Sequence, residues 1–100
     1  MKKVLLLNFD VGSGVEYFGN VISKILQGRT DIDLVEIKRQ DHWAFITNDI
    51  IEINPDVIIL NDLFERYVVC SYMYKLFKPE TKVICFSHTW KNLFISKNFN

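Results

Sequence analysis

Two glycines flank a serine at Gly12, Ser13 and Gly14, shortly after an apolar run that ends at Leu7. Glycine lets a backbone approach a ligand closely, and a serine hydroxyl both donates and accepts hydrogen bonds. A helix that starts near Glu16 would point its free N–H groups and its positive dipole end at the same place. The turn is therefore predicted to bind a phosphate or a sugar hydroxyl. The alternative is an ordinary strand-to-helix turn in which glycine is simply tolerated.

The spacing around this turn limits the chemistry. No Gly-Lys-Ser or Gly-Lys-Thr follows it, which excludes a Walker A loop. Tyr17 stands where a dinucleotide-binding G-x-G-x-x-G turn needs glycine, so an oxidoreductase is the least favoured hypothesis, although Glu36 lies about where a ribose-binding acid would be. Cys70 and Cys85 lie in apolar runs without a second Cys or His at zinc spacing, and we interpret both as reduced core residues. No cofactor and no metal is expected.

Polar residues also follow two other apolar segments. Asn61 and Asp62 come after Val57–Leu60, and His88 comes after the segment 81–87. Because the carboxyl ends of parallel strands meet at one edge of a sheet, these residues, Glu16 and the glycine turn are predicted to line one crevice and to bind the same ligand. His88 either donates a hydrogen bond to a sugar or phosphate or caps the next helix. Asn61 and Asp62 are candidates for binding the same ligand and for capping the helix that follows them.

The elements that position these residues alternate along the chain. The apolar runs 4–7 and 57–60 are typical of strands covered on both faces, 34–38 is typical of a strand nearer the edge, and a fourth strand is expected at 81–87. Helices are expected over 16–27, 42–53 and 63–78. Short connections between alternating strands and helices require parallel pairing. This predicts one Rossmann-like, three-layer α/β/α domain over residues 1–100, with sheet order 2-1-3-4 or, as the alternative, 3-2-1-4.

Helical periodicity predicts which faces are buried. The helix 16–27 has one apolar stripe, whereas the helix 63–78 has two, on opposite sides. One stripe of the second helix meets the sheet, and the other needs a partner, either a second copy of the chain or a missing domain. The stripes are Phe18, Val21, Ile22, Ile25 and Leu26 in the first helix, and Leu63, Tyr67, Cys70, Tyr74 and Phe77, then Val68, Val69, Tyr72 and Leu76, in the second.

Charge and hydropathy restrict the partners further. Lys plus Arg and Asp plus Glu both number 12, so no net positive field attracts nucleic acid, and no nucleic-acid partner is expected. The apolar run after Met1-Lys2-Lys3 stops at Asn8, which is too short for a signal peptide or a membrane span. The expected location is the cytoplasm, with a peripheral membrane association left open.

The motifs occur in a characteristic order: the Gly12–Gly14 turn before Val15-Glu16, then the segment 54–59 (NPDVII), then the segment 82–88 (KVICFSH). In this order they resemble the N-terminal half of GT-B glycosyltransferases of the retaining, group 1 kind. That family usually has two adjacent glycines where this chain has Gly12-Ser13-Gly14. The C-terminal donor-binding domain of the family, with two glutamates separated by seven residues, is not found in these 100 residues.

The resemblance implies a role for the crevice. The Gly12–Gly14 turn would lie in a cleft near the acceptor and the donor diphosphate, and His88 would be the catalytic residue that approaches the transferred sugar. A nucleotide sugar or a sugar acceptor is then the expected ligand, and no activity is expected of this chain alone. The alternative function is a non-catalytic interaction module that self-associates through the helix 63–78.

Overall fold

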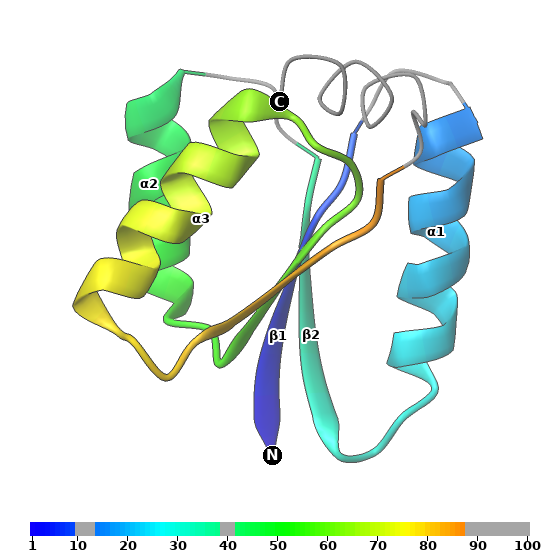
Figure 1. Cartoon of the computed structure of the whole chain (residues 1–100). Helices are drawn as coiled ribbons and strands as arrows, with labels where there is room; N and C mark the ends of the chain where they lie inside the picture. Colours follow the sequence, from blue (N-terminus) through cyan, green and yellow to red (C-terminus); the bar gives the residue numbers. More distant parts are fainter. Residues whose placement is uncertain (10–13, 39–41, 88–100) are drawn as a thin grey trace.

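The computed structural model describes residues 1–9, 14–38 and 42–87. Four parallel strands form one sheet in the order β2-β1-β3-β4, with α1 on one face and α2 and α3 on the other (Figure 1). This confirms the predicted α/β class and the order 2-1-3-4, and the alternative order is wrong. The elements are β1 (Lys2–Leu7), α1 (Gly14–Gln27), β2 (Ile32–Ile37), α2 (Trp43–Ile53), β3 (Val57–Leu60), α3 (Glu65–Phe77) and β4 (Lys82–Cys85).

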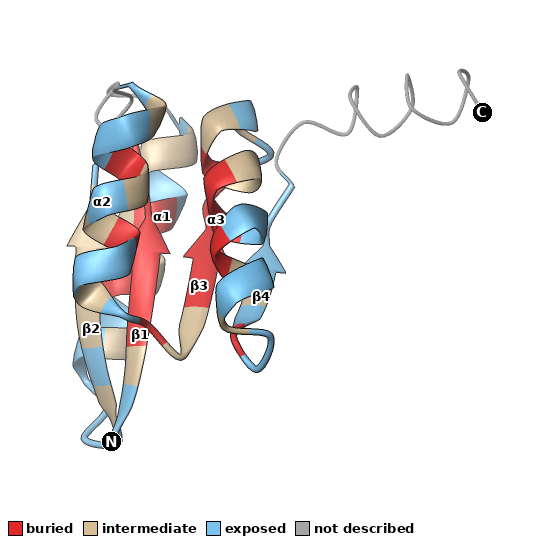
Figure 2. Cartoon of the chain, turned by 90° about the vertical axis from the view of Figure 1, so that its left-hand side faces the viewer, coloured by how far each residue is buried: buried red, intermediate tan, exposed pale blue. Residues whose placement is uncertain are grey.

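The continuous apolar run in β1 is explained by the two layers that cover it. Leu5 and Leu7 belong to a buried cluster with residues of α2 and α3, whereas Val4 and Leu6 pack with residues of α1 on the opposite face. Successive side chains of a strand point to opposite faces, so a strand buried on both sides needs an apolar residue at every position. β3 follows the same rule, and Figure 2 shows the buried residues concentrated in these two central strands.

The two outer strands are exposed to different degrees. β2 is half-buried along most of its length, whereas only Val83 of β4 is even partly buried. The interpretation of Cys85 as a core residue is therefore wrong, because β4 lies at the edge of the sheet and Cys85 is exposed. Cys70 is buried, as expected.

The buried face of α1 matches the predicted stripe only in part: Ile22 and Leu26 pack against β1 and β3 as expected. Its fully buried positions are Gly19 and Ser23, while Phe18, Val21 and Ile25 remain exposed. In α3, Tyr67, Cys70 and Tyr74 are buried as predicted, but the ends of that stripe are exposed at Leu63 and Phe77. Within the described part of the chain, no helix combines the length and apolar character needed to cross a membrane.

Helix ends depend on a few side chains. His42 caps α2, since its Nδ1 accepts a hydrogen bond from the Ala44 N–H at 3.2 Å. Asn54 ends α2 in a left-handed conformation (φ 52°), and the Tyr74 hydroxyl of α3 donates to its Oδ1 at 2.6 Å. The N-cap position of α3 falls on Phe64, which makes no side-chain cap hydrogen bond. Capping of this helix by Asn61 or Asp62 as the N-cap residue is therefore wrong.

Asp56 joins the amino ends of the two central strands. Its carboxylate accepts a hydrogen bond from the Lys3 N–H at 2.9 Å, and its own N–H donates to the Lys3 carbonyl at 2.8 Å. The Lys78 ammonium lies 3.4 Å from the same carboxylate. The Lys3 hydrogen bond, followed by the contact with Lys78, lowers the pKa of Asp56. Asp56 therefore stabilises the fold in its charged form.

Replacement of Asp56 by Asn should make the free energy of unfolding less dependent on pH between pH 7 and pH 3. A carboxyl group with a lowered folded pKa stabilises above its unfolded pKa of about 4, and the stabilisation is lost as the pH falls through the folded value. We expect Asp56→Asn to lower the free energy of unfolding at pH 7 and to differ less from the wild type at pH 3, measured by urea denaturation. Asp33→Asn, which removes an exposed charge from β2, is the matched control. An equal loss at both pH values would contradict the assignment.

Candidate functional site

The direction of chain winding reverses between β1 and β3. From β1 the chain passes to β2 on one side, and from β3 it passes to β4 on the other. Asn8 and Asn61 are the residues that directly follow these two strands, so both stand at the reversal. Of the predicted site residues, Gly12, Ser13 and His88 lie outside the described residues, whereas Gly14, Glu16, Asn61 and Asp62 lie within them.

A buried amide pair occupies this position. The Asn61 Nδ2 donates to the Asn8 Oδ1 at 2.7 Å and to the Val15 carbonyl of α1, also at 2.7 Å. Both asparagines are fully buried. The Tyr67 hydroxyl of α3 donates to the Asn8 carbonyl at 2.7 Å. The pair therefore connects the carboxyl ends of both central strands to the first turn of α1 and to α3.

The network continues beneath α1 to the outer strand β2. The Asn8 Nδ2 donates to the Glu36 Oε2 at 2.7 Å and to the Asn20 Oδ1 at 3.2 Å. The other Glu36 oxygen accepts from the Ser23 hydroxyl at 3.2 Å. Glu36, which by position could have bound a ribose, is thus engaged with two groups of this chain. Its carboxylate satisfies buried donors that would otherwise cost about 1–3 kcal/mol each.

Gly19 makes this network sterically feasible. A Cβ on Gly19 would overlap the side-chain amides of both Asn8 and Asn61, so any larger residue would push α1 off the sheet. Ser23, one turn further along the same face, is also small and is buried. We did not predict this network from the sequence. An isolated glycine inside a helical pattern is the signal that could have revealed the close approach.

The rim of the reversal point carries the charged groups. Glu16 of α1 and Lys38, just after β2, form an ion pair at 3.4 Å, with 16% and 35% of their side chains exposed. Gly14 begins α1 and is exposed. The Asp62 carboxylate accepts from the Leu63 N–H at 2.8 Å. Asn61 differs from these rim residues, because both hydrogens of its amide already serve the buried network, so its direct contribution is to position α1.

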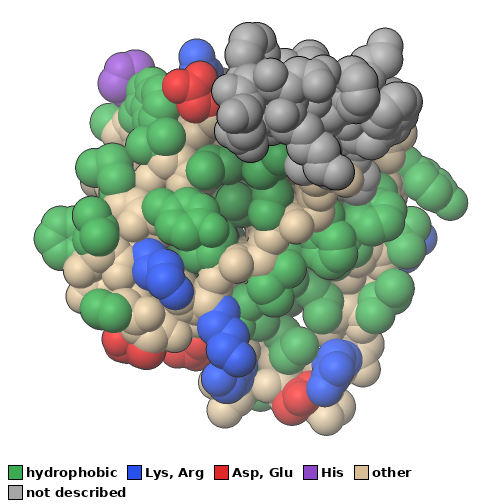
Figure 3. Space-filling view, viewed as in Figure 1, with side chains coloured by type: hydrophobic (Ala, Val, Ile, Leu, Met, Phe, Trp, Pro, Cys, Tyr) green, Lys and Arg blue, Asp and Glu red, His purple; other side chains and the backbone are tan. Residues whose placement is uncertain are grey.

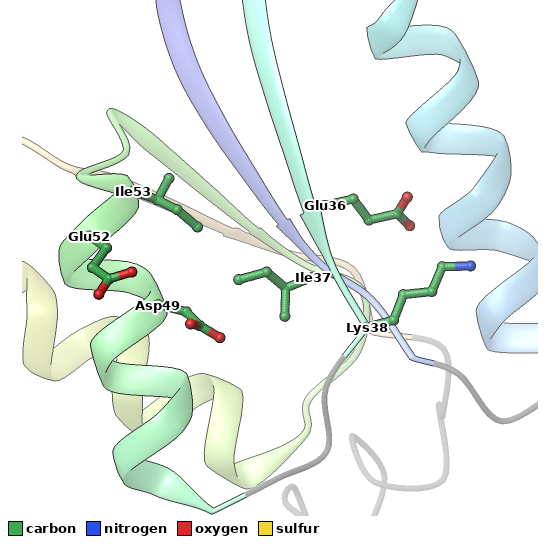
Figure 4. A pocket seen from close by; sticks show the side chains of 6 residues that line it. All are labelled: Glu36, Ile37, Lys38, Asp49, Glu52 and Ile53. Carbon is green, nitrogen blue, oxygen red and sulfur yellow. The ribbon is translucent and has the colours of Figure 1, made fainter.

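A separate cavity of about 420 Å³ lies beside the carboxyl end of β2. Three carboxylates line it, but Figure 4 shows that they do not converge: Glu36 and Lys38 point to the α1 side of the sheet, whereas Asp49 and Glu52 belong to α2 on the other side. Across the described ranges, no cluster of His, Cys, Asp and Glu could hold a metal ion. This cavity therefore shows no convergent set of ligands.

Comparisons with protein-family models, with curated proteins and with solved structures found no match for this chain. The geometry of the site itself is therefore the basis for its chemistry.

The Gly19→Ala variant tests the close approach of α1. Alanine raises helix propensity by up to about 1 kcal/mol over glycine, but overpacking typically costs about 1–3 kcal/mol. We expect overpacking to dominate and to lower the free energy of unfolding in urea. Gly14→Ala is the matched control in the same helix, since no described atom lies within 4 Å of its new Cβ. A Gly19→Ala variant as stable as the Gly14→Ala variant would refute the packing argument.

The Asn8→Asp variant tests the polarity of the network. It replaces the donor that lies 2.7 Å from Glu36 with a second carboxylate, which creates a partly buried like-charge pair. We expect a loss of about 2–4 kcal/mol at pH 7 that diminishes as the pH is lowered and one carboxyl group binds a proton. The double variant Asn8→Asp/Glu36→Gln should recover part of the loss, because the glutamine amide can donate to the new carboxylate. Absence of this recovery would contradict the assigned contacts.

Proposed function

We propose that the chain binds a sugar or a sugar-linked diphosphate at the carboxyl-end edge of its sheet, as the acceptor-side domain of a GT-B type glycosyltransferase. The observation that carries the proposal is the reversal of winding between β1 and β3, with the first turn of α1 held over it. Ligands of open parallel sheets bind outside the strand ends at such a reversal. The order of the sequence motifs supports the sugar-transfer part of the proposal.

The start of α1 supports the binding of an anion or a hydroxyl group. The first N–H groups of a helix have no partner within the helix and carry its positive dipole end. Apart from its chain neighbours and the backbone of its own helix, no described atom lies within 4 Å of the Cβ position of Gly14, so no described side chain blocks a ligand there. The hydrogen bond from Asn61 to the Val15 carbonyl fixes the direction in which the turn points. A prearranged site of this kind spends little free energy on ordering the chain.

The ion pair at the rim supports a ligand with hydroxyl or phosphate oxygens. Lys38 can donate to either group, whereas Glu16 accepts from a sugar hydroxyl and repels a phosphate. A diphosphate would therefore compete with Glu16 for the Lys38 ammonium, and a neutral sugar would not. This difference makes the two ligand chemistries distinguishable.

On this proposal the chain orients an acceptor and does not complete a transfer reaction by itself. Positioning of both reactants lowers the barrier of a bimolecular step, and a donor-binding unit would have to supply the second reactant. Binding without turnover is the expected behaviour of the isolated chain.

Titration of the ¹⁵N-labelled chain with UDP-glucose, pyrophosphate and methyl glucoside tests the proposal. We expect the amide resonances of Gly14, Val15 and Glu16 to shift, while those of α2 do not. Glu16→Gln should strengthen pyrophosphate binding several-fold, because it frees the Lys38 ammonium, and should not strengthen methyl glucoside binding, because Glu16 accepts from a sugar hydroxyl in this proposal. If no probe moves these resonances, the proposed function is wrong.

A further inference from the structure

The outer face of α3 and the edge strand β4 lie next to each other and both expose apolar side chains. Those of α3 lie on one face of the sheet, whereas Ile84 and the following Phe86 lie on the other face, beside Leu26 and Phe18 of α1. A groove of about 710 Å³ runs along α3 from Val68 to Pro79, and β4 follows directly after it. Figure 2 shows the exposed faces of α3 and β4 on the same side of the molecule, and Figure 3 shows hydrophobic side chains gathered around the β4 edge. We infer that this α3–β4 surface binds a second copy of the chain, through antiparallel pairing of the two β4 strands.

The backbone of β4 defines which groups face outward. The Lys82 N–H donates to the Asp56 carbonyl at 3.1 Å, and the Phe86 N–H donates to the Leu60 carbonyl at 3.0 Å. Backbone groups alternate between the two sides of a strand, so Val83 and Cys85 turn theirs away from β3. No other described strand pairs with this edge. An edge of this kind is a template for pairing with another strand.

The register of the pairing follows from the neighbouring residues. A two-fold axis between two antiparallel copies of β4 places one residue opposite the same residue of the partner copy. Centring on Ile84 joins the outward groups of Val83 to those of Cys85 in the partner copy. Centring on Val83 would instead require Thr81, whose N–H and carbonyl already bond to the Lys78 carbonyl and the Lys75 ammonium. Of these two registers, the one centred on Ile84 pairs the outward groups of both Val83 and Cys85, so we place Ile84 on the axis.

The same two-fold covers the outer face of α3. The axis is perpendicular to the sheet, so both copies of α3 lie on one side of the eight-stranded sheet that results. α3 contacts both β3 and β4. With strands about 4.8 Å apart, the two helix axes come about 10 Å apart, which is the distance at which helices pack. The two-fold axis therefore pairs the outward backbone groups of β4 and, in the same dimer, buries the second apolar stripe of α3.

The area and the charges fit a second copy. The exposed fractions of the large apolar side chains run from 37% to 81%, for Tyr72, Met73 and Leu76 on the α3 side of the sheet and Ile84 and Phe86 on the α1 side. Together they offer on the order of 500 Å² of apolar area, against roughly 800 Å² per partner in a standard interface. Lys82 begins β4, and at the other end partial burial and then the nearby negative charge of Asp62 raise the pKa of Cys85. The two-fold brings Lys82 of one copy toward the end of β4 in the other copy, the end near which Asp62 lies.

Sedimentation equilibrium of the whole chain, with Leu76→Glu and Ile25→Glu as a matched pair, tests the surface. Both residues are exposed and apolar, but Ile25 lies on α1. We expect a dimer whose dissociation constant rises about 100-fold or more in Leu76→Glu and stays within a few-fold of the wild type in Ile25→Glu. Circular dichroism confirms that both variants fold. A wild-type monomer, or a dimer that Leu76→Glu leaves intact, would overturn the proposal and point to another occupant or another surface.

A cysteine on the axis tests the register. In the Ile84→Cys/Cys85→Ser variant, the two new thiols stand opposite each other in a pair without mutual backbone hydrogen bonds, where Cα atoms are about 4.5 Å apart, within disulfide range. We expect a covalent dimer under mild oxidation, and no covalent dimer from the Cys85→Ser variant alone. A reversible dimer of the Ile84→Cys/Cys85→Ser variant that does not cross-link would contradict the β4 pairing.

Discussion

The buried amide pair of Asn8 and Asn61 constrains the rest of this structure. Both side chains have left water completely, so each polar atom needs a partner within the protein. Those partners come from β2, α1 and each other, and α3 donates to the backbone of Asn8. An apolar core tolerates small shifts of a helix over a sheet, but a set of hydrogen bonds at 2.7 Å does not. The pair therefore specifies one position for α1.

This constraint explains the unusual face of α1. The helix meets the sheet through Gly19 and Ser23, and a larger apolar residue at Gly19 would block the contact with both amides. Ile22 and Leu26 pack beside this polar line and supply the apolar contact with β1 and β3. Exposure of Phe18, Val21 and Ile25 follows, because the face that they form is turned away from the network. The hydrogen bonds of the buried amide pair, rather than burial of the largest apolar stripe, set the orientation of α1.

Apolar runs and polar contacts differ in how far the sequence predicts them. The runs and their spacing predict the four strands, the parallel pairing and the order, because burial on both faces leaves a direct trace in composition. Hydrogen bonds between residues 28 or 53 positions apart leave no such trace, so the roles of Asn8 and Glu36 were not predicted. The apolar neighbours of Cys85 resemble those of a central strand, and local sequence does not show whether a strand has a neighbour on both sides. The candidate ligand residues remain a prediction, and Gly12, Ser13 and His88 lie outside the described residues.

The two edges of the sheet differ in a way that bears on partners. β2 carries Asp33 and Glu36, and Lys38 follows it directly, whereas Lys82 is the one charged residue of β4. Charged side chains on an edge strand oppose pairing with another chain, and their scarcity favours it. α2 and α3 cover the sheet from one side, yet α3 leaves its outer stripe beside the edge with fewer charges. A contact that buried only the outer stripe of α3, or only the β4 edge, would leave the other exposed to solvent. A single contact between two copies of the chain would remove both from solvent.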